Sequence, residues 1–145
     1  MTHAVDVVLE AFRAVEHRNR EALEALFHPE IEFHWPPSLP YGGSVRGQGV
    51  FRPQSPTWSE TWQPLQPDEE RRMDPRVVAA SDEEVVVLWR QRGVDAAGDR
   101  FDGPVLGLYG VRDGKLARAQ MFYFDTVEVV DFLAQAQRPP RANGA

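Results

Sequence analysis

Apolar residues recur along the chain with two different periods, and these periods predict where helices and strands lie. Near the N-terminus they fall on one face of an amphipathic helix at Val5, Val8, Leu9, Phe12 and Val15. Asn19 is suited to cap a second, shorter helix that ends at His28-Pro29. The apolar side of this second helix is formed by Leu23, Leu26 and Phe27. The first part of the chain is therefore predicted to be a helical hairpin.

The period changes to two at residues 30–35, "EIEFHW", which predicts a strand. Its alternation places Ile31, Phe33 and Trp35 on one face and Glu32 and His34 on the other. The sequence alone leaves open which face points inward. The next two residues are prolines, which cannot donate ladder hydrogen bonds. The stretch 33–43, "FHWPPSLPYGG", is thus predicted to be a strand end that continues into a rigid loop.

The rest of the chain predicts one short helix, a set of strands and a closing helix. Prolines interrupt residues 47–76, although 57–62 has room for a short helix. Strand patterns follow at 76–80, 84–94, 100–111 and 115–124. The connections between the last three have turn residues, so these strands are expected to pair as antiparallel hairpins. Asp125 and Glu128 have the spacing of a capping box that opens the last helix.

This order of elements predicts an α+β fold, in which a cone-shaped, curved antiparallel sheet packs against the N-terminal helices. The sequence has no repeats and no second domain, so residues 1–137 are interpreted as a single domain and 138–145 as a disordered tail.

Composition narrows the possible partners. The chain has 145 residues, of which 22 are acidic and 16 basic, giving a formal net charge of -6. That balance disfavours nucleic acid as a partner. Cysteine is absent, and the sequence shows no secretion signal and no membrane span. It also has no metal-ligand spacing and no phosphate-binding loop. A cytoplasmic protein without a metal or cofactor is therefore expected.

Three segments, in the order and spacing found here, resemble the SnoaL-like branch of the nuclear-transport-factor-2-like superfamily. They are "ALFHPEIEFHWPP", "PYGGSVRGQGV" and "FDGPVLGLYGVRDGKLARAQMFYFDT", and the resemblance covers about residues 4–137. It implies a cystatin-like cone with a mostly apolar pocket, a homodimer formed by the outer faces of the sheet, and no required cofactor. It does not define the chemistry, because this superfamily uses the cone for isomerases, cyclases, hydrolases and binding modules.

Three residues are candidates for acid–base chemistry. Asp125 best matches the carboxylate that removes a proton beside a carbonyl in SnoaL-like cyclases, but it is equally suited to be only a helix cap. His34 is a candidate base, or proton donor to a carbonyl, near neutral pH, or else a residue on the hydrated face of its strand. Tyr41 is a candidate hydrogen-bond donor to a developing enolate, or a residue that covers the loop.

Aromatic residues are the candidates for substrate binding, because the wide end of a cone is both core and ligand wall. Those selected are Trp35, Trp62, Trp89, Tyr109 and Tyr123. Arg90, within a strand, is expected on an exposed face, or else beside Asp125 or a substrate carboxylate.

Two main functions are consistent with these residues. The first is acid–base isomerisation or cyclisation of a small hydrophobic, polyketide-like carbonyl compound. For this function, the sequence lacks the second acid that ketosteroid isomerases and the related epoxide hydrolases use. The alternative is a binding or carrier module that holds a hydrophobic small molecule without converting it. A dimeric structural partner of another enzyme is the third hypothesis.

Overall fold

The computed structural model describes residues 3–47 and 56–138. Its helices are α1 (Ala4–Glu16), α2 (Arg20–Ala25), α3 (Trp58–Trp62) and α4 (Thr126–Ala136), with two short 3-10 turns, η1 (Gln63–Leu65) and η2 (Asp68–Glu70). Its strands are β1 (Phe27–Trp35), β2 (Gly43–Arg46), β3 (Arg76–Ala80), β4 (Glu84–Val94), β5 (Arg100–Arg112) and β6 (Lys115–Tyr123). The predicted α+β class is confirmed. The predicted tail lies outside the described residues except for Arg138.

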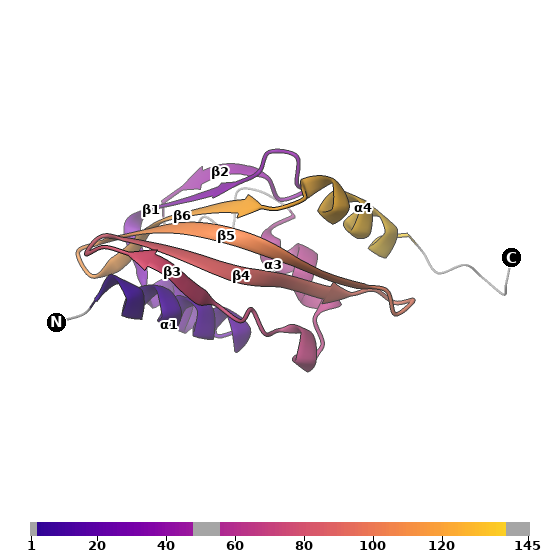
Figure 1. The fold of residues 1–145 in the computed structure, drawn as a ribbon, viewed down its shortest axis with the longest axis horizontal. Helices are drawn as coiled ribbons and strands as arrows, with labels where there is room; N and C mark the ends of the chain where they lie inside the picture. The colour runs from indigo at the N-terminus through magenta and orange to yellow at the C-terminus, as the bar shows by residue number, and fades with distance from the viewer. Residues whose placement is uncertain (1–2, 48–55, 139–145) are drawn as a thin grey trace, which may run out of the picture.

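All six strands form one curved sheet in the order β2-β1-β6-β5-β4-β3 (Figure 1). Strands β3 to β6 pair as consecutive antiparallel hairpins, of which the turn residues predicted those that join β4, β5 and β6. The sheet is not antiparallel throughout, because β1 runs parallel to β6. This pairing joins residues far apart in the sequence, such as Glu32 and Arg118. No local turn signal could have predicted it.

The boundary between α2 and β1 differs from the prediction. Asn19 caps α2 as expected, its side chain accepting a hydrogen bond from the Ala22 N–H. However, α2 ends at Ala25, and Phe27 already belongs to β1. The Leu26 carbonyl accepts from the Leu116 N–H at 2.8 Å, so pairing with β6 extends this end of the strand. Tertiary pairing thus overrides the local helical pattern.

Strand β2 was not predicted: its first residue, Gly43, belongs to the stretch interpreted as a rigid loop, and no element was assigned to residues 44–46. It pairs antiparallel with β1, aligning Val45 with Phe33 and Gly43 with Trp35. In the proline-rich loop between the two strands, Leu39 and Tyr41 are buried, whereas Pro37, Ser38 and Pro40 are exposed.

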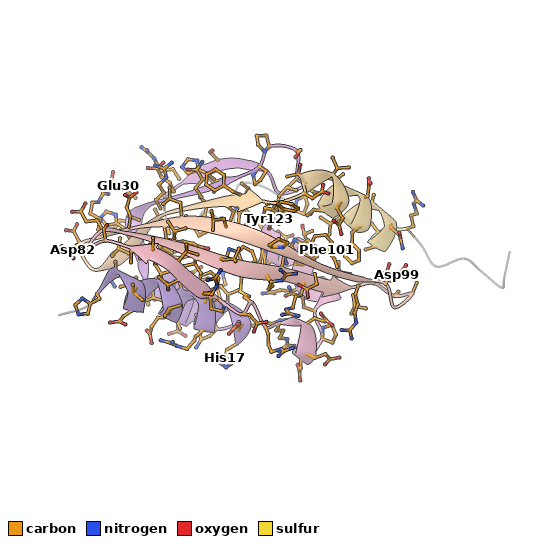
Figure 2. The ribbon with its side chains drawn as sticks, in the orientation of Figure 1. His17, Glu30, Asp82, Asp99, Phe101 and Tyr123 are labelled. Carbon is orange, nitrogen blue, oxygen red and sulfur yellow. The ribbon has the colours of Figure 1, made fainter. Side chains whose placement is uncertain are left out.

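Helix α1 lies along one face of the sheet, and α4 lies near the end at which β6 finishes (Figure 1). In Figure 2, Asp82 lies in the connection before β4 and Asp99 in the turn between β4 and β5. Buried side chains form two clusters, one between α1 and the inner face of the sheet and one around Trp62, Phe101 and α4. The inner face therefore has an α1 end and an α4 end, and the cavity described next lies at the α1 end.

Candidate functional site

A cavity of about 660 Å³ opens between the helices and the inner face of the sheet. Helices α1 and α2 form one side, α3 and η1 another, and inward-facing residues of β1, β4, β5 and β6 form the floor. This volume lies within the range of small-molecule sites, about 300–1,000 Å³. The fold therefore provides room for one compound of small-molecule size.

The wall of the cavity is mainly aromatic and aliphatic. Its aromatic members are Phe12, Phe27, Phe33, Trp35, Trp58, Trp89 and Tyr109. Phe12 packs edge-on against the Trp89 ring at 6.1 Å and the Tyr109 ring at 5.7 Å, which links α1 to the floor. Phe33 and Trp35 are stacked along β1. The face of β1 carrying these two rings is thus the inward one.

Gly107 makes room for the Tyr109 ring on the floor. A Cβ atom at position 107 would lie 2.4 Å from the Tyr109 phenol oxygen, closer than any real contact. The two residues are on the same face of β5, two positions apart. Glycine at this position therefore allows the phenol ring to lie against the strand.

The mouth of the cavity is polar. It is formed by Arg18, Asn19 and Arg20 from the α1–α2 turn and by residues at the start of α3, including Glu60. A capping box fixes this end of α3: Glu60 N–H donates to the Thr57 hydroxyl oxygen, and the Thr57 backbone N–H donates to the Glu60 carboxylate. The Glu60 carboxylate is thus already used in holding the helix.

A chain of hydrogen bonds lies behind the cavity wall and holds one of the wall's aromatic residues, Trp58, in place. Trp62 Nε1 donates to the Tyr41 hydroxyl at 2.9 Å, Tyr41 donates to the Tyr123 hydroxyl at 2.8 Å, and Tyr123 donates to Gln91 Oε1 at 3.0 Å. Trp58 Nε1 donates to the same oxygen at 2.7 Å. Gln91 is only 1% exposed, and its Nε2 has no partner among the described residues. This network orients Trp58, the one member that lines the cavity.

The three tyrosines lie in or beside this region, Tyr41 and Tyr109 buried and Tyr123 partly buried. Burial raises the pKa of Tyr41, Tyr109 and Tyr123 above the ordinary tyrosine value, and the neighbouring Tyr41 raises that of Tyr123 further. Their phenols are therefore protonated at neutral pH. Such groups donate hydrogen bonds, but they are not suited to removing protons from a substrate.

His34 lies on the opposite face of β1 from the cavity. Its ring contacts the Ser44 hydroxyl at 2.7 Å and the Glu32 carboxylate at 3.0 Å. Arg46 donates to the same carboxylate at 3.0 Å. These hydrogen bonds, the one with His34 first, lower the pKa of Glu32. The structure thus places His34 in a polar cluster on β1 and β2.

Asp125 lies at the N-terminus of α4, and its carboxylate accepts a hydrogen bond from the Glu128 N–H at 3.1 Å. It does not line the cavity. Arg90 forms an ion pair with Asp102 at 2.8 Å on the outer side of the sheet, rather than with Asp125. The cap geometry is the one predicted as the alternative to a catalytic role.

The structure therefore separates the predicted site residues into two groups. Trp35, Trp89 and Tyr109 line the cavity. The others lie elsewhere, either buried behind the wall or on other surfaces: Trp62, Tyr123, Tyr41, His34 and Asp125.

Sequence reasoning did not select Phe12, Arg18, Trp58 or Gln91 for the site. Gln91 could have been recognised from the sequence, because it is the only amide side chain in the alternating, inward-facing positions of β4, between Trp89 and Gly93. Arg18 had none, since its role depends on contacts with residues more than forty positions away.

Within residues 3–47 and 56–138, no three or more His, Cys, Asp or Glu side chains gather as they would around a metal ion. In the same ranges no helix has the length and apolar character needed to cross a membrane.

The chain thus forms an α+β roll with an aromatic cavity beneath its helices. The profile of the SnoaL-like domain matches residues 8–119. The chain belongs to the SnoaL-like domain family. A search of curated proteins gives no match.

Solved structures agree on the fold. TerC, crystallised with polyporic acid, is 18% identical, with a TM-score of 0.74 and coverage of 90% of this chain and 97% of its own. An NTF2-like protein of unknown function from Burkholderia pseudomallei is 20% identical, with a TM-score of 0.75 and coverages of 92% and 98%. A Pseudomonas putida protein provisionally named a polyketide cyclase is 17% identical, with a TM-score of 0.69 and coverages of 90% and 98%. At these identities the likeness establishes the fold alone.

Proposed function

We propose that this protein binds a flat, largely apolar small molecule in the cavity beneath α1 and α3. The observation that carries the proposal is the aromatic wall of a cavity of about 660 Å³. Aromatic rings at several angles offer both faces and edges to a planar ligand. Each 100 Å² of apolar ligand surface that is buried contributes about 2.5 kcal/mol before the entropic costs of binding.

The lining supports binding more directly than proton transfer. No aspartate or histidine is among the described residues that line the cavity, and the carboxylate at its mouth, Glu60, is engaged in the α3 capping box. The two predicted bases, Asp125 and His34, form hydrogen bonds elsewhere. A general base must reach the proton it removes, directly or through one water.

One observation favours a second candidate function, acid–base chemistry on a bound carbonyl compound. The Tyr109 phenol lines the cavity, and burial keeps it protonated. It is therefore placed to donate a hydrogen bond to a ligand carbonyl and to polarise it. TerC, which shares this fold, was crystallised with polyporic acid, which supports a small-molecule ligand for either function.

A fluorescence titration with the neutral dye N-phenylnaphthylamine tests the binding function. The wild-type protein is expected to bind one dye molecule per chain. Ala119→Leu adds three carbon atoms to the cavity floor and is expected to weaken binding about tenfold, equivalent to about 1.4 kcal/mol. Ala80→Leu, the same change at an exposed strand position, is the control and is expected to leave affinity unchanged.

Each variant is checked for cooperative unfolding before its affinity is compared. Absence of dye binding by the wild type, or equal effects of the two variants, would show that the cavity is not the binding site.

A further inference from the structure

Arg18 occupies a backbone position that normally favours glycine. It follows the end of α1, beside His17 (labelled in Figure 2), and its φ is +55°. The Arg18 N–H donates to the Val15 carbonyl, and the Asn19 N–H donates to the Ala14 carbonyl. These two bonds define a Schellman motif with Arg18 at its left-handed position. An arginine at this position destabilises the turn relative to glycine, so its side chain is the feature to explain.

The Arg18 side chain extends across the mouth of the cavity. Its Nη2 donates to the carbonyls of Gln63 and Gln66, each at 2.8 Å, and so connects the α1–α2 turn to η1. Both bonds use the same nitrogen. Among the described residues, neither Nη1 nor Nε of Arg18 has an acceptor, and no carboxylate forms an ion pair with it. This guanidinium also lines the cavity.

The charges around Arg18 leave it available to an anion. Arg71 is close enough to act on it electrostatically and also donates to the Gln66 carbonyl. The neighbouring carboxylate, Asp68, forms its ion pair with Arg71 at 3.2 Å. Asp68 is thus paired with Arg71, and two guanidinium groups lie near a single carboxylate. Across the mouth, Glu60 is held in its capping box with Thr57.

We infer that the ligand carries an acidic oxygen group, a carboxylate or an enolate, and that Arg18 binds this group at the mouth while the apolar body fills the cavity. Guanidinium groups form strong, charge-assisted hydrogen bonds with such anions. Because Nη2 already donates to the Gln63 and Gln66 carbonyls, Nη1 and Nε are the nitrogens that can each donate to the anion. The inference rests on the proposed function, since it requires the cavity to hold the rest of the ligand. It adds a charge requirement to an otherwise apolar site.

Two dyes with the same ring skeleton test the inference, neutral N-phenylnaphthylamine and its anionic counterpart anilinonaphthalene sulfonate. In Arg18→Gly the left-handed turn has its preferred residue, so the helix end is retained while the guanidinium is lost. Affinity for the anionic dye is expected to fall about tenfold or more, and affinity for the neutral dye less than about threefold. Arg18→Gln, which keeps a long side chain without charge, must give the same selective loss.

Arg13→Gln is the control for charge, because Arg13 lies on the outer side of α1, where it pairs with Glu10. It is expected to change neither affinity. Equal losses for both dyes in the Arg18 variants would show that Arg18 is only a structural tether, and would overturn the inference while the binding function stands. Failure of the neutral dye to bind the wild type would instead overturn the binding function, and the inference with it.

Discussion

Replacing Tyr41 by phenylalanine distinguishes a structural role of its hydroxyl from a catalytic one. Tyr41 is 4% exposed, and its hydroxyl both accepts from Trp62 and donates to Tyr123. Phenylalanine keeps the ring that packs edge-on against Trp35 at 5.1 Å. The change therefore removes two hydrogen bonds and little else.

The expected destabilisation follows from these contacts. Trp62 is 0% exposed, so its N–H is left buried without an acceptor, which costs about 1–3 kcal/mol. Loss of the bond to Tyr123 adds about 1 kcal/mol. The free energy of unfolding should thus fall by about 2–4 kcal/mol, which lowers the melting temperature of a chain of this size by about 6–12 °C. Urea denaturation followed by tryptophan fluorescence measures the loss.

A double-mutant cycle with Tyr123→Phe tests the assignment. Because the two hydroxyls are directly bonded, the combined loss should differ from the sum of the single losses by at least about 0.5 kcal/mol. Affinity for N-phenylnaphthylamine should be unchanged in Tyr41→Phe, since Tyr41 does not line the cavity. A destabilisation below about 0.5 kcal/mol, or loss of binding at unchanged stability, would refute the structural role.

Three further results are expected. Asp125→Ala should lower the free energy of unfolding by about 1 kcal/mol through loss of the α4 cap, with dye affinity unchanged; a loss of affinity at unchanged stability would contradict this. The raised pKa values of the three tyrosines mean that the folded protein holds these protons more tightly than the unfolded chain. Stability should therefore be retained below about pH 10 and fall above it, by up to about 1.4 kcal/mol per pH unit for each tyrosine. Phenolate absorbance should then appear together with loss of circular dichroism, and its appearance in the folded protein near pH 10 would contradict the burial. We also expect a homodimer through the outer sheet face, where Phe122, 49% exposed, pairs with exposed Leu106; Phe122→Glu should give monomers in sedimentation velocity, and a monomeric wild type would contradict the expectation.

Elements with a local signal were predictable from the sequence. The Asn19 cap, helix α3 (Trp58–Trp62) and the hairpins that join β4, β5 and β6 each depend on residues close together in the chain. The parallel pairing of β1 with β6 depends instead on contacts across most of the sequence, and it also moves the end of α2. Strand β2 is four residues long and contains a positive-φ glycine at Gly43, so its pattern is too short to recognise.

The candidate site was predictable in its character but not in its members. Trp35, Trp89 and Tyr109 were selected because they are aromatic, and they line the cavity, although the alternation left open which face of residues 31–35 points inward. Tyr41 and Trp62 are also aromatic and were selected for the site too, yet they belong to the buried network beside α4. Which aromatic faces a cavity and which fills the core depends on how helices cover the sheet, and that arrangement is not encoded in any single segment.

The most direct test of ligand binding uses the four tryptophans as reporters. Trp35, Trp58 and Trp89 line the cavity, whereas Trp62 is buried against Phe101 and Phe132 in the other cluster. In a two-dimensional nitrogen–proton NMR spectrum, each indole N–H gives its own signal. On titration with N-phenylnaphthylamine, the signals of the three cavity tryptophans should shift together while that of Trp62 stays in place. Unchanged signals for the three, or a shift confined to Trp62, would contradict binding in this cavity.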